Sequence, residues 1–353
     1  MPRVRVAILG ASGLVSQRMQ QRLSSHPWFE LVAVAGQSPG VKLSEIEWRL
    51  NEARPPFFDE CDIEIFDIYD ANLSQKFLQQ QVRVVFSALP SEPAMEIEAQ
   101  LVDAGLHVFS NASAYRMHPE VPLVVADVNP QALVRPRGNR PLHACSTNCT
   151  LIPILHPLSV LSKHYEIAKV VARSEQALSG AGWKLLLDST LSSEAIGQEV
   201  PGEAEKIIEE IGRILQLEHV EWDVQCQRVD EQDGHIVHVD VHLNEAPAFE
   251  TIESMLSASD SEHYPPLPSQ PMFSMTLTKF EPSRKENLWN GQTIQSIQPS
   301  VDLKAGMTTT VQLKSVEKGV VSFTGLSHNT IRGAAGGVVL LAELAHFNNF
   351  FKQ

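Results

Sequence analysis

The residue best suited to chemistry is a cysteine placed where a polar loop runs into a predicted helix. Cys149 follows Asn148, a residue type that often caps helices, and the apolar residues after it recur at helical spacing. A thiol at a helix N-terminus lies in the positive field of the backbone amides, which favours the reactive thiolate. The alternative is a buried structural cysteine, since free cysteine is among the most buried residue types.

Two polar side chains beside predicted strands could assist such a thiol. Gln176 stands between a strand over 167–172 and the turn Ser179-Gly180-Ala-Gly182, where glycines leave room for a ligand near the backbone. A bare loop would need the same glycines. His235 follows a glycine and precedes alternating valines typical of a strand, so it is a candidate general acid or base. A surface histidine fits the same pattern.

Charged residues near these positions could bind an anionic substrate. Arg116 precedes an apolar run, 121–126, that predicts a strand, and an arginine on such a loop suits a phosphate or a carboxylate. A surface ion pair is the alternative. A predicted helix after Pro201-Gly202 opens with Glu203, which suits the helix dipole, and with Lys206, which does not. The misplaced lysine mildly indicates function, although such charges usually form a solvated face.

The first half of the chain predicts a nucleotide-binding fold. A strand over 4–9 runs into Gly10-Ala-Ser12-Gly13-Leu14-Val15, then a helix, and then a second strand over 29–35. In such a β-α-β unit the glycine turn brings backbone amides to a pyrophosphate at the helix start, although a plain tight turn also fits this spacing. A third strand over 82–86 leads into Ser87, where the chain could turn past a cofactor.

The residues after the second strand bear on cofactor choice. An NAD-binding fold usually presents an acidic residue there to the ribose 2′-hydroxyl, but the stretch 36–42 contains neither Asp nor Glu. A 2′-phosphate would not be repelled, so NADP is preferred, with Ser38 as a hydroxyl donor and Lys42 as a further charge.

Composition narrows the class of protein. At 353 residues the chain is long enough for two domains, and its net charge of −14 argues against nucleic-acid or anionic-membrane partners. Four cysteines indicate a reducing compartment, the cytoplasm, and no second Cys/His pair accompanies Cys145 and Cys149 to form a metal site. Stretches 183–200 and 251–270 are rich in Ser, Glu and Pro and are expected to be loops or peripheral elements.

Taken together and in order, these motifs resemble the aspartate-semialdehyde dehydrogenase family. The likeness runs nearly end to end and is nearest to the archaeal and fungal branch. It is carried by Gly10 to Ser16, Asn148-Cys149-Thr150, Gln176 with the 179–182 turn, Arg228 seven residues before His235, and Asn329 with Arg332-Gly-Ala-Ala-Gly336.

The resemblance implies roles for these residues. Cys149 would be the nucleophile, His235 the acid or base, and Gln176 the residue that orients the acyl group, with the Asn148 side chain near the oxyanion. Substrate contacts would come from Arg228, Glu203, Lys206 and, for phosphate, Arg116. Asn329 would lie beside the nicotinamide of NADP. The remaining cofactor contacts are expected at Gly10, Ser12, Gly13, Leu14, Val15, Ser38, Ser87, Ser179 and Gly180.

The family also implies an architecture and a reaction. A Rossmann-type parallel-sheet domain, 1–149 and 326–353, would bind the cofactor, and an α+β domain, 150–325, would catalyse and dimerise. The chain would form a homodimer or homotetramer. It would convert L-aspartyl 4-phosphate to L-aspartate semialdehyde through a cysteine thioester, a step in lysine, methionine and threonine biosynthesis.

Some positions depart from the family pattern. Asp230-Glu231 interrupts the strand between Arg228 and His235, while His328 and the Ala35-Gly36 loop are similar to archaeal malonyl-CoA reductase. Two alternatives therefore stand beside the first reading. One is a paralogous reductase of another acyl phosphate or acyl-CoA, and the other is an inactive NADP-binding redox sensor.

Overall fold

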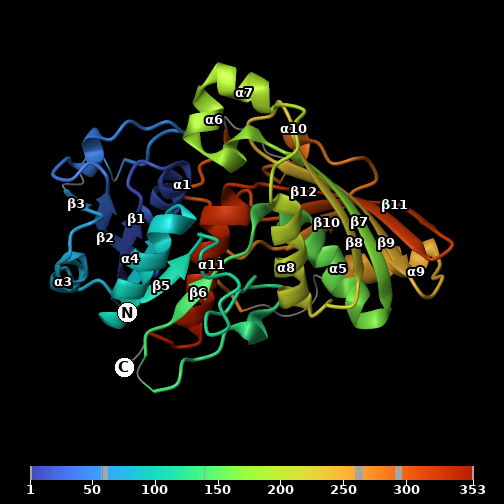
Figure 1. Cartoon of the computed structure of the whole chain (residues 1–353), viewed down its shortest axis with the longest axis horizontal. Helices are drawn as coiled ribbons and strands as arrows, with labels where there is room; N and C mark the ends of the chain where they lie inside the picture. The colour runs from blue at the N-terminus through green and yellow to red at the C-terminus, as the bar shows by residue number, and fades with distance from the viewer. Residues whose placement is uncertain are drawn as a thin grey trace.

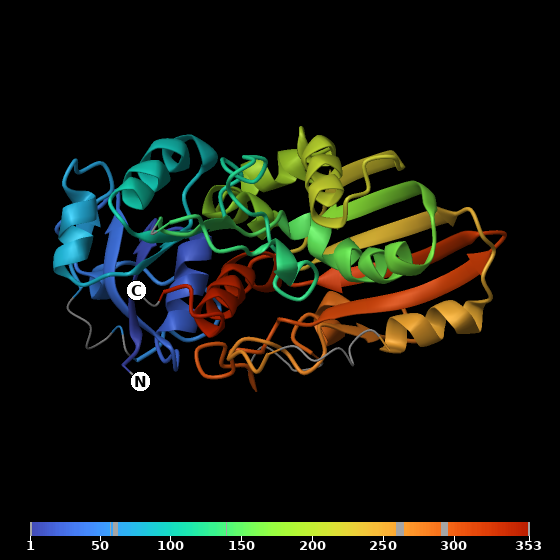
Figure 2. The ribbon, with the colours of Figure 1, turned by 90° about the horizontal axis from the view of Figure 1, so that it is seen from below.

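The computed structural model describes residues 2–56, 58, 63–138, 140–258, 265–290 and 296–351. The chain builds two six-stranded sheets that lie side by side, each with its own helices. Both termini lie on the side of the first sheet, because the C-terminal helix returns to it (Figure 2).

The first sheet is parallel throughout, in the order β3-β2-β1-β4-β5-β6. This order reverses direction between β1 and β4, which is where doubly wound sheets bind ligands. Its strands are β1 (Val4–Leu9), β2 (Phe29–Gly36), β3 (Ile65–Asp67), β4 (Val84–Ser87), β5 (His107–Ser110) and β6 (His143–Cys145). The Rossmann-type cofactor domain predicted from the sequence is therefore confirmed.

Helices cover both faces of this sheet because β1 is apolar on both sides. Val6 and Ile8 pack with residues of α1 and α11, while Ala7 and Leu9 pack with residues of α3 and α4. The four helices are α1 (Leu14–Leu23), α3 (Leu73–Gln79), α4 (Ser91–Asp103) and α11 (Gly336–Phe347). Continuous apolar strands of this kind are typical of parallel sheets.

The second sheet is mixed and runs in the order β10-β11-β12-β9-β7-β8. One face packs on helices α5 (Ile152–His164), α8 (Glu203–Leu215) and α9 (Phe249–Ala258). Its strands are β7 (Ile167–Gln176), β8 (Glu221–Arg228), β9 (His235–Leu243), β10 (Met275–Leu277), β11 (Thr309–Glu317) and β12 (Val320–Ser327). The opposite face is polar and half-exposed, with Arg173, Glu175 and His238 on neighbouring strands.

The structure lacks one strand expected from the sequence and adds helices to two stretches expected to be loops or peripheral elements. The run 121–126 forms no strand beyond one bridge between Leu123 and Cys145, because the Asn129 side chain bonds the Val125 N–H and the Leu123 carbonyl at 2.8 and 3.0 Å. The run is apolar because it is buried, and an apolar run of this length is also typical of a strand. The stretch 183–200 is a peripheral element rather than a loop: it contains two short helices without buried residues, α6 (Trp183–Leu187) and α7 (Ser189–Ala195). Part of 251–270 likewise belongs to α9, and 259–264 lie outside the described residues.

Candidate active site

Cys149 begins a helix, as the sequence predicts. Strand β6 ends at Cys145, and Cys149 opens a single 3₁₀ turn, Cys149–Leu151, that continues into α5. Asn148 is the N-cap, with extended φ and ψ of −60° and 139°, and its side-chain oxygen accepts the Thr150 N–H at 2.8 Å. This local cap sets the thiol at the amide end of the helix.

His235 lies against the thiol and has one defined tautomer. Its Nε2 is 3.3 Å from the Cys149 sulfur, and its Nδ1 is 3.1 Å from the backbone nitrogen of Ala177. A backbone N–H can only donate, so Nδ1 is the acceptor and the neutral ring carries its proton on Nε2, facing the sulfur. Burial, together with the charge of Arg228, holds the pKa of His235 well below its usual value. The ring is therefore a neutral hydrogen-bond donor.

The thiol itself is held in its protonated form. Burial and the nearby Glu203 carboxylate raise the pKa of Cys149 to about 12, and Arg116 and Arg228 only partly oppose them. The helix start alone predicts a thiolate, whereas burial and Glu203 shift the pKa in the opposite direction. Thiol and imidazole are thus both neutral before a substrate arrives.

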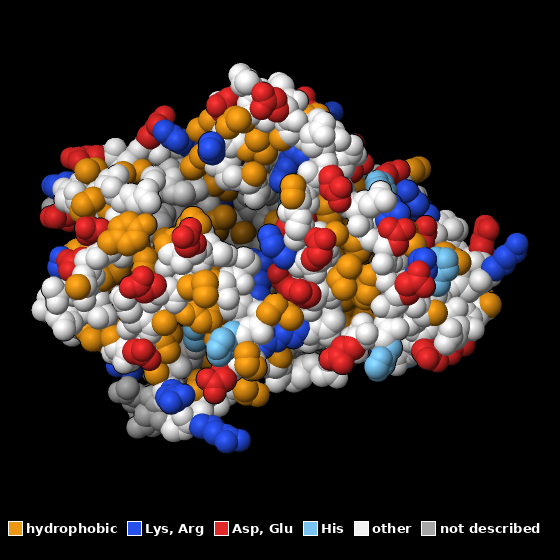
Figure 3. Space-filling view, in the orientation of Figure 1, with side chains coloured by type: hydrophobic (Ala, Val, Ile, Leu, Met, Phe, Trp, Pro, Cys, Tyr) orange, Lys and Arg blue, Asp and Glu red, His pale blue; other side chains and the backbone are white. Residues whose placement is uncertain are grey.

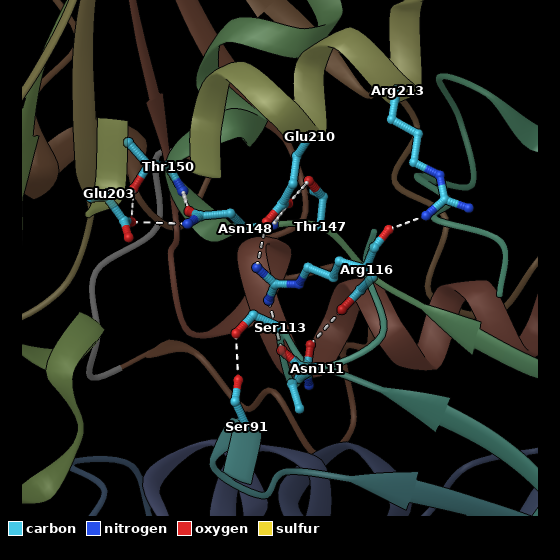
Figure 4. Close-up of polar contacts among 12 residues, drawn as sticks. Ser91, Asn111, Ser113, Arg116, Thr147, Asn148, Thr150, Glu203, Glu210 and Arg213 are labelled. Atoms are coloured by element: carbon cyan, nitrogen blue, oxygen red, sulfur yellow. Dashed lines mark hydrogen bonds and ion pairs between the residues drawn. The ribbon is translucent and has the colours of Figure 1, made fainter. Parts of the chain in front are cut away.

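Glu203, the first residue of α8, gathers the polar side chains around Cys149. Its Oε1 accepts hydrogen bonds from the Asn148 amide at 2.9 Å and the Thr150 hydroxyl at 3.3 Å (Figure 4). The same oxygen accepts one from the Gln176 amide at 3.2 Å. Gln176 also donates to the Thr150 hydroxyl at 2.9 Å. This network fixes Asn148 and Gln176 relative to the thiol. Among the described residues none bonds the other Glu203 oxygen, Oε2.

Glu210, two turns further along α8, is a site residue that the motifs did not reveal. It is buried; its Oε1 lies 2.9 Å from Arg116 Nη1, and its Oε2 accepts the Asn148 N–H at 2.7 Å and the Thr147 hydroxyl at 2.8 Å. Figure 4 shows it between the arginine and the cysteine loop. An acidic residue next to Ile211, on the apolar stripe of α8, is the signal that could have identified it.

Arg116 and Arg228 both donate hydrogen bonds to other groups of the protein. Arg116 Nη2 donates to the Asn111 carbonyl at 2.6 Å, in addition to its pair with Glu210. Arg228 donates to the Ala177 carbonyl at 2.7 Å, and its guanidinium lies behind Gly180, where an added Cβ would be 3.1 Å from Arg228 Nη1. Lys206 is exposed and has no ion-pair partner among the residues that the structure describes.

Gly333, which belongs to the motif Arg332-Gly-Ala-Ala-Gly336, packs directly against the cysteine turn. It lies in the π-helical turn Ile331–Ala335 before α11, and a Cβ added to it would be 2.5 Å from the Cβ of Cys149. Only a residue without a side chain permits this approach. The small residues at the opening of the last helix therefore bring its backbone against the nucleophilic turn.

A cleft of about 270 Å³ is lined by residues from both halves of the molecule. Its lining includes residues from the first half, the second half and the C-terminal segment: Val15, Arg116, Asn148, Cys149, Ser179, Gly180, Glu203, Lys206 and Asn329. Figure 3 shows the hollow between the halves, with charged side chains of both signs near it. Gln176, Arg228 and His235 do not line the cleft; they are buried behind it.

The other predicted cofactor residues are spread along the carboxyl edge of the first sheet. Gly10 has a φ of +97°, and Gly13 is the N-cap of α1. Ser12 and Leu14 belong to the same turn, but they do not line the cleft, and the Ser12 carbonyl accepts the Trp183 indole N–H at 3.0 Å. Ser87 is fully buried at the end of β4. Ser38 is exposed after β2, away from the residues that line the cleft.

Comparison with known proteins places the chain in a family. Residues 5–135 match the profile described as "Semialdehyde dehydrogenase, NAD binding domain". The chain is 32% identical to an aspartate-semialdehyde dehydrogenase of Archaeoglobus fulgidus, with 97% of this chain and 98% of that protein covered. It belongs to the aspartate-semialdehyde dehydrogenase family. The resemblance read from the motifs is therefore confirmed.

Other relatives are similar over their full length. An aspartate-semialdehyde dehydrogenase of Aspergillus fumigatus is 29% identical, with 98% of this chain and 97% of that protein covered. A crystal structure of the Candida albicans aspartate-semialdehyde dehydrogenase with NADP matches at a TM-score of 0.76 and 27% identity, covering 99% of this chain and 100% of that one. A malonyl-CoA reductase of Metallosphaera sedula is 26% identical, with 97% of this chain and 96% of that protein covered. The archaeal and fungal affinity predicted from the sequence thus agrees with these relatives.

Proposed function

We propose that the chain catalyses the NADP-dependent interconversion of L-aspartyl 4-phosphate and L-aspartate semialdehyde through a thioester on Cys149. The observation that carries this proposal is the Cys149 sulfur 3.3 Å from His235 Nε2, at a cleft lined by Lys206, Arg116 and Asn329. The site thus combines a nucleophile, a hydrogen-bond donor, two cations and the amide of Asn329 on the cofactor side. Acyl transfer to a thiol requires such a combination. The product feeds lysine, methionine and threonine biosynthesis.

The residues of the first sheet fit a dinucleotide. Helix α1 has no acidic residue in its first turn and no side chain capping its start, so its amides are open to a pyrophosphate. Gly36 lies against Ala11, where an added Cβ would be 2.9 Å from that of Ala11. When bound, NADP supplies or accepts the hydride. Its contacts are assigned to Gly10, Ser12, Gly13, Leu14, Val15, Ser38, Ser87, Ser179, Gly180 and Asn329.

The proton path follows from the tautomer of His235. Because its Nε2 already carries a proton, the ring cannot accept one from the thiol in this arrangement. As sulfur attacks the acyl carbon and the carbon–oxygen bond to phosphate breaks, the thiol proton passes to a phosphate oxygen, and hydrogen phosphate leaves beside Arg116 and Lys206. The Nε2–H of His235 stabilises the sulfur whenever it carries negative charge, including when the aldehyde is released.

Substrate contacts are assigned around the thiol. The free Oε2 of Glu203 suits an ammonium group, and Lys206 and Arg116 suit phosphate. Gln176 orients the acyl group, and the Cys149 amide with the Asn148 side chain suits the oxyanion. Arg228 is assigned to the substrate carboxylate; its Nη1 already donates to the Ala177 carbonyl, and its Nε and Nη2 are left for this contact as far as the described residues show.

We further propose the organisation of the whole protein. Residues 1–149 and 326–353 form the cofactor domain, and 150–325 form the catalytic and dimerisation domain. A second copy is expected on the open polar face of the second sheet, giving a homodimer or homotetramer. A thiol nucleophile suits the cytoplasm, as do the cysteines that are free among the described residues, Cys145, Cys149 and Cys226. Within the described part of the chain, no helix is long and apolar enough to span a bilayer.

The reverse reaction provides the test. Purified protein is mixed with L-aspartate semialdehyde, phosphate and NADP or NAD, and the absorbance of the reduced cofactor is followed. We expect reduction of NADP that is lost in Cys149→Ser. Oxidation of NADPH with malonyl-CoA but no turnover of aspartate semialdehyde would favour the paralogous reductase. Binding of NADP without turnover of either substrate would favour a sensor.

A further inference from the structure

The acidic loop between Arg228 and His235 packs on the substrate-binding turn. The loop, residues 229–234, joins β8 to β9, and the carbonyls of Glu231 and Gln232 accept the N–H groups of Leu178 and Ser179 at 2.8 and 3.1 Å. Residues 230–231, which depart from the family pattern, thus lie in a loop that joins two strands and whose backbone is hydrogen-bonded to Leu178 and Ser179. Its last two residues, Asp233 and Gly234, directly precede His235.

Asp233 is the centre of a polar network at the cleft. Its Oδ1 accepts hydrogen bonds from the Ser179 hydroxyl at 2.7 Å and the Thr330 hydroxyl at 3.4 Å. Asn329 completes the network, because its amide donates to the Ser179 hydroxyl and its oxygen accepts the Gly234 N–H, both at 2.8 Å. The turn that carries His235 is therefore bonded to two residues assigned to the nicotinamide side of the cleft.

The other oxygen of Asp233 faces the cofactor domain. Its Oδ2 lies 3.6 Å from Nη2 of Arg18, a buried residue of α1. The same guanidinium contacts Glu52 at 2.6 Å through Nη1, so it bridges a carboxylate of each domain. Two more contacts join these regions, Asn51 to Gln232 at 3.1 Å and the Trp183 indole to the Ser12 carbonyl at 3.0 Å. Helix α1 begins at the glycine turn, so Arg18 is one turn from the pyrophosphate site.

We propose that Asp233 is a positioning residue that links α1, through Arg18, to the turn carrying His235. A dinucleotide at the start of α1 then sets the distance between His235 and the Cys149 sulfur, and the thiol becomes reactive when the cofactor is in place. The inference rests on the proposed cofactor site. It assigns a function to an ion pair between buried Arg18 and partly buried Asp233 that would otherwise serve only to hold two domains together.

The test uses a cofactor fragment that cannot shield the thiol. 2′-Phospho-ADP-ribose lacks the nicotinamide, so any change that it causes at Cys149 must pass through the protein. The rate of Cys149 alkylation by iodoacetamide is measured with and without this fragment. We expect an acceleration of about fivefold in the wild type, which is the lower end of typical coupling between sites. An unchanged wild-type rate would overturn the proposal.

Two variants and a matched control locate the coupling. Asp233→Asn keeps an oxygen for Ser179 but loses the charge facing Arg18, and Arg18→Lys keeps a cation for Glu52 but loses the forked contact. Both should bind the fragment yet show almost no acceleration, and Asp233→Asn should lower kcat more than it raises the KM for NADP. Asp230→Asn, an exposed change in the same loop, should behave like the wild type.

Two results separate the alternatives. Asp233→Asn could lose thermal stability and still show the full acceleration of alkylation by the fragment. That result would mean that the Arg18–Asp233 pair is purely structural, and it would refute the inference. The alkylation assay needs only the binding of a dinucleotide fragment. If the wild type showed the acceleration but did not turn over aspartate semialdehyde, the inference would stand and the proposed reaction would fail.

Discussion

Substituting Gly333 by alanine should disable the site through geometry alone. The added Cβ would be 2.5 Å from the Cβ of Cys149 and 2.8 Å from its Cα, where ordinary contacts begin at 3.4 Å. Neither neighbour is the end of a flexible side chain. Relief of the overlap therefore requires a backbone shift of about 1 Å in the cysteine turn or in the turn Ile331–Ala335.

This shift gives the size of the effect. The contact between the Cys149 sulfur and His235 Nε2 is 3.3 Å, so a further 1 Å breaks it. A misplacement of that size costs about a hundredfold in kcat, and overpacking destabilises a protein by about 1–3 kcal/mol. Gly333→Ala should therefore fold, bind NADP and turn over aspartate semialdehyde about a hundredfold more slowly than the wild type.

The assay compares steady-state rates and urea unfolding for Gly333→Ala and a matched glycine variant. Gly212 lies in α8 with nothing within 4 Å of an added Cβ. Gly212→Ala should keep full activity and gain about 0.5–1 kcal/mol, since alanine is the better helix former. Wild-type kcat in Gly333→Ala, or a crystal structure of that variant with the sulfur still 3.3 Å from Nε2, would refute the reasoning.

Two predictions concern protonation. Removing the charge of Glu203 by Glu203→Gln should lower the pKa of Cys149, which burial and this carboxylate raise to about 12. The rate of iodoacetamide alkylation below that pKa should then rise, about tenfold for each unit lost, and an equal or slower rate would contradict it. The hydrogen bond from His238, with that from Arg284, lowers the pKa of Glu175 from 4.5 to about 2. A lowered carboxyl pKa stabilises the fold above pH 4.5, and this stability is lost as the pH falls towards 2. Glu175→Gln should flatten the pH dependence of the urea midpoint over that window, and a curve parallel to the wild type would exclude the assignment.

The parts of the site that were predicted from the sequence are those that local rules determine. Asn148 caps the helix that starts at Cys149, and Gly10 turns the chain between β1 and α1, because each interaction spans only a few residues. The likeness to a known family then brought distant motifs into one hypothesis. Cys149, Glu203 and Asn329 line one cleft, as that hypothesis requires.

The parts that were missed depend on packing between distant segments. Glu210 bonds the Asn148 N–H from 62 positions away. Gly333 lies in a motif that the sequence shows, but its contact with Cys149 forms only because the last helix returns to the first sheet. The pKa of the thiol depends on such packing as well. A helix start is visible in a sequence, whereas the desolvation that raises the pKa of Cys149 appears only once the surrounding elements are in place.

The charges around the thiol also bear on which acyl donor the site can use. Arg116 is balanced by Glu210, and the Cys149 pKa is high, so the resting site holds a neutral thiol beside an imidazole that can only donate. Attack therefore needs a base that arrives with the substrate. An acyl phosphate supplies one, because its phosphoryl oxygens carry negative charge and leave as hydrogen phosphate with the thiol proton. A simple acyl-CoA has no such oxygen near the reacting carbon, so it would require a thiolate that this environment disfavours. The electrostatics thus favour an acyl donor that carries its own anionic oxygen, as an acyl phosphate does.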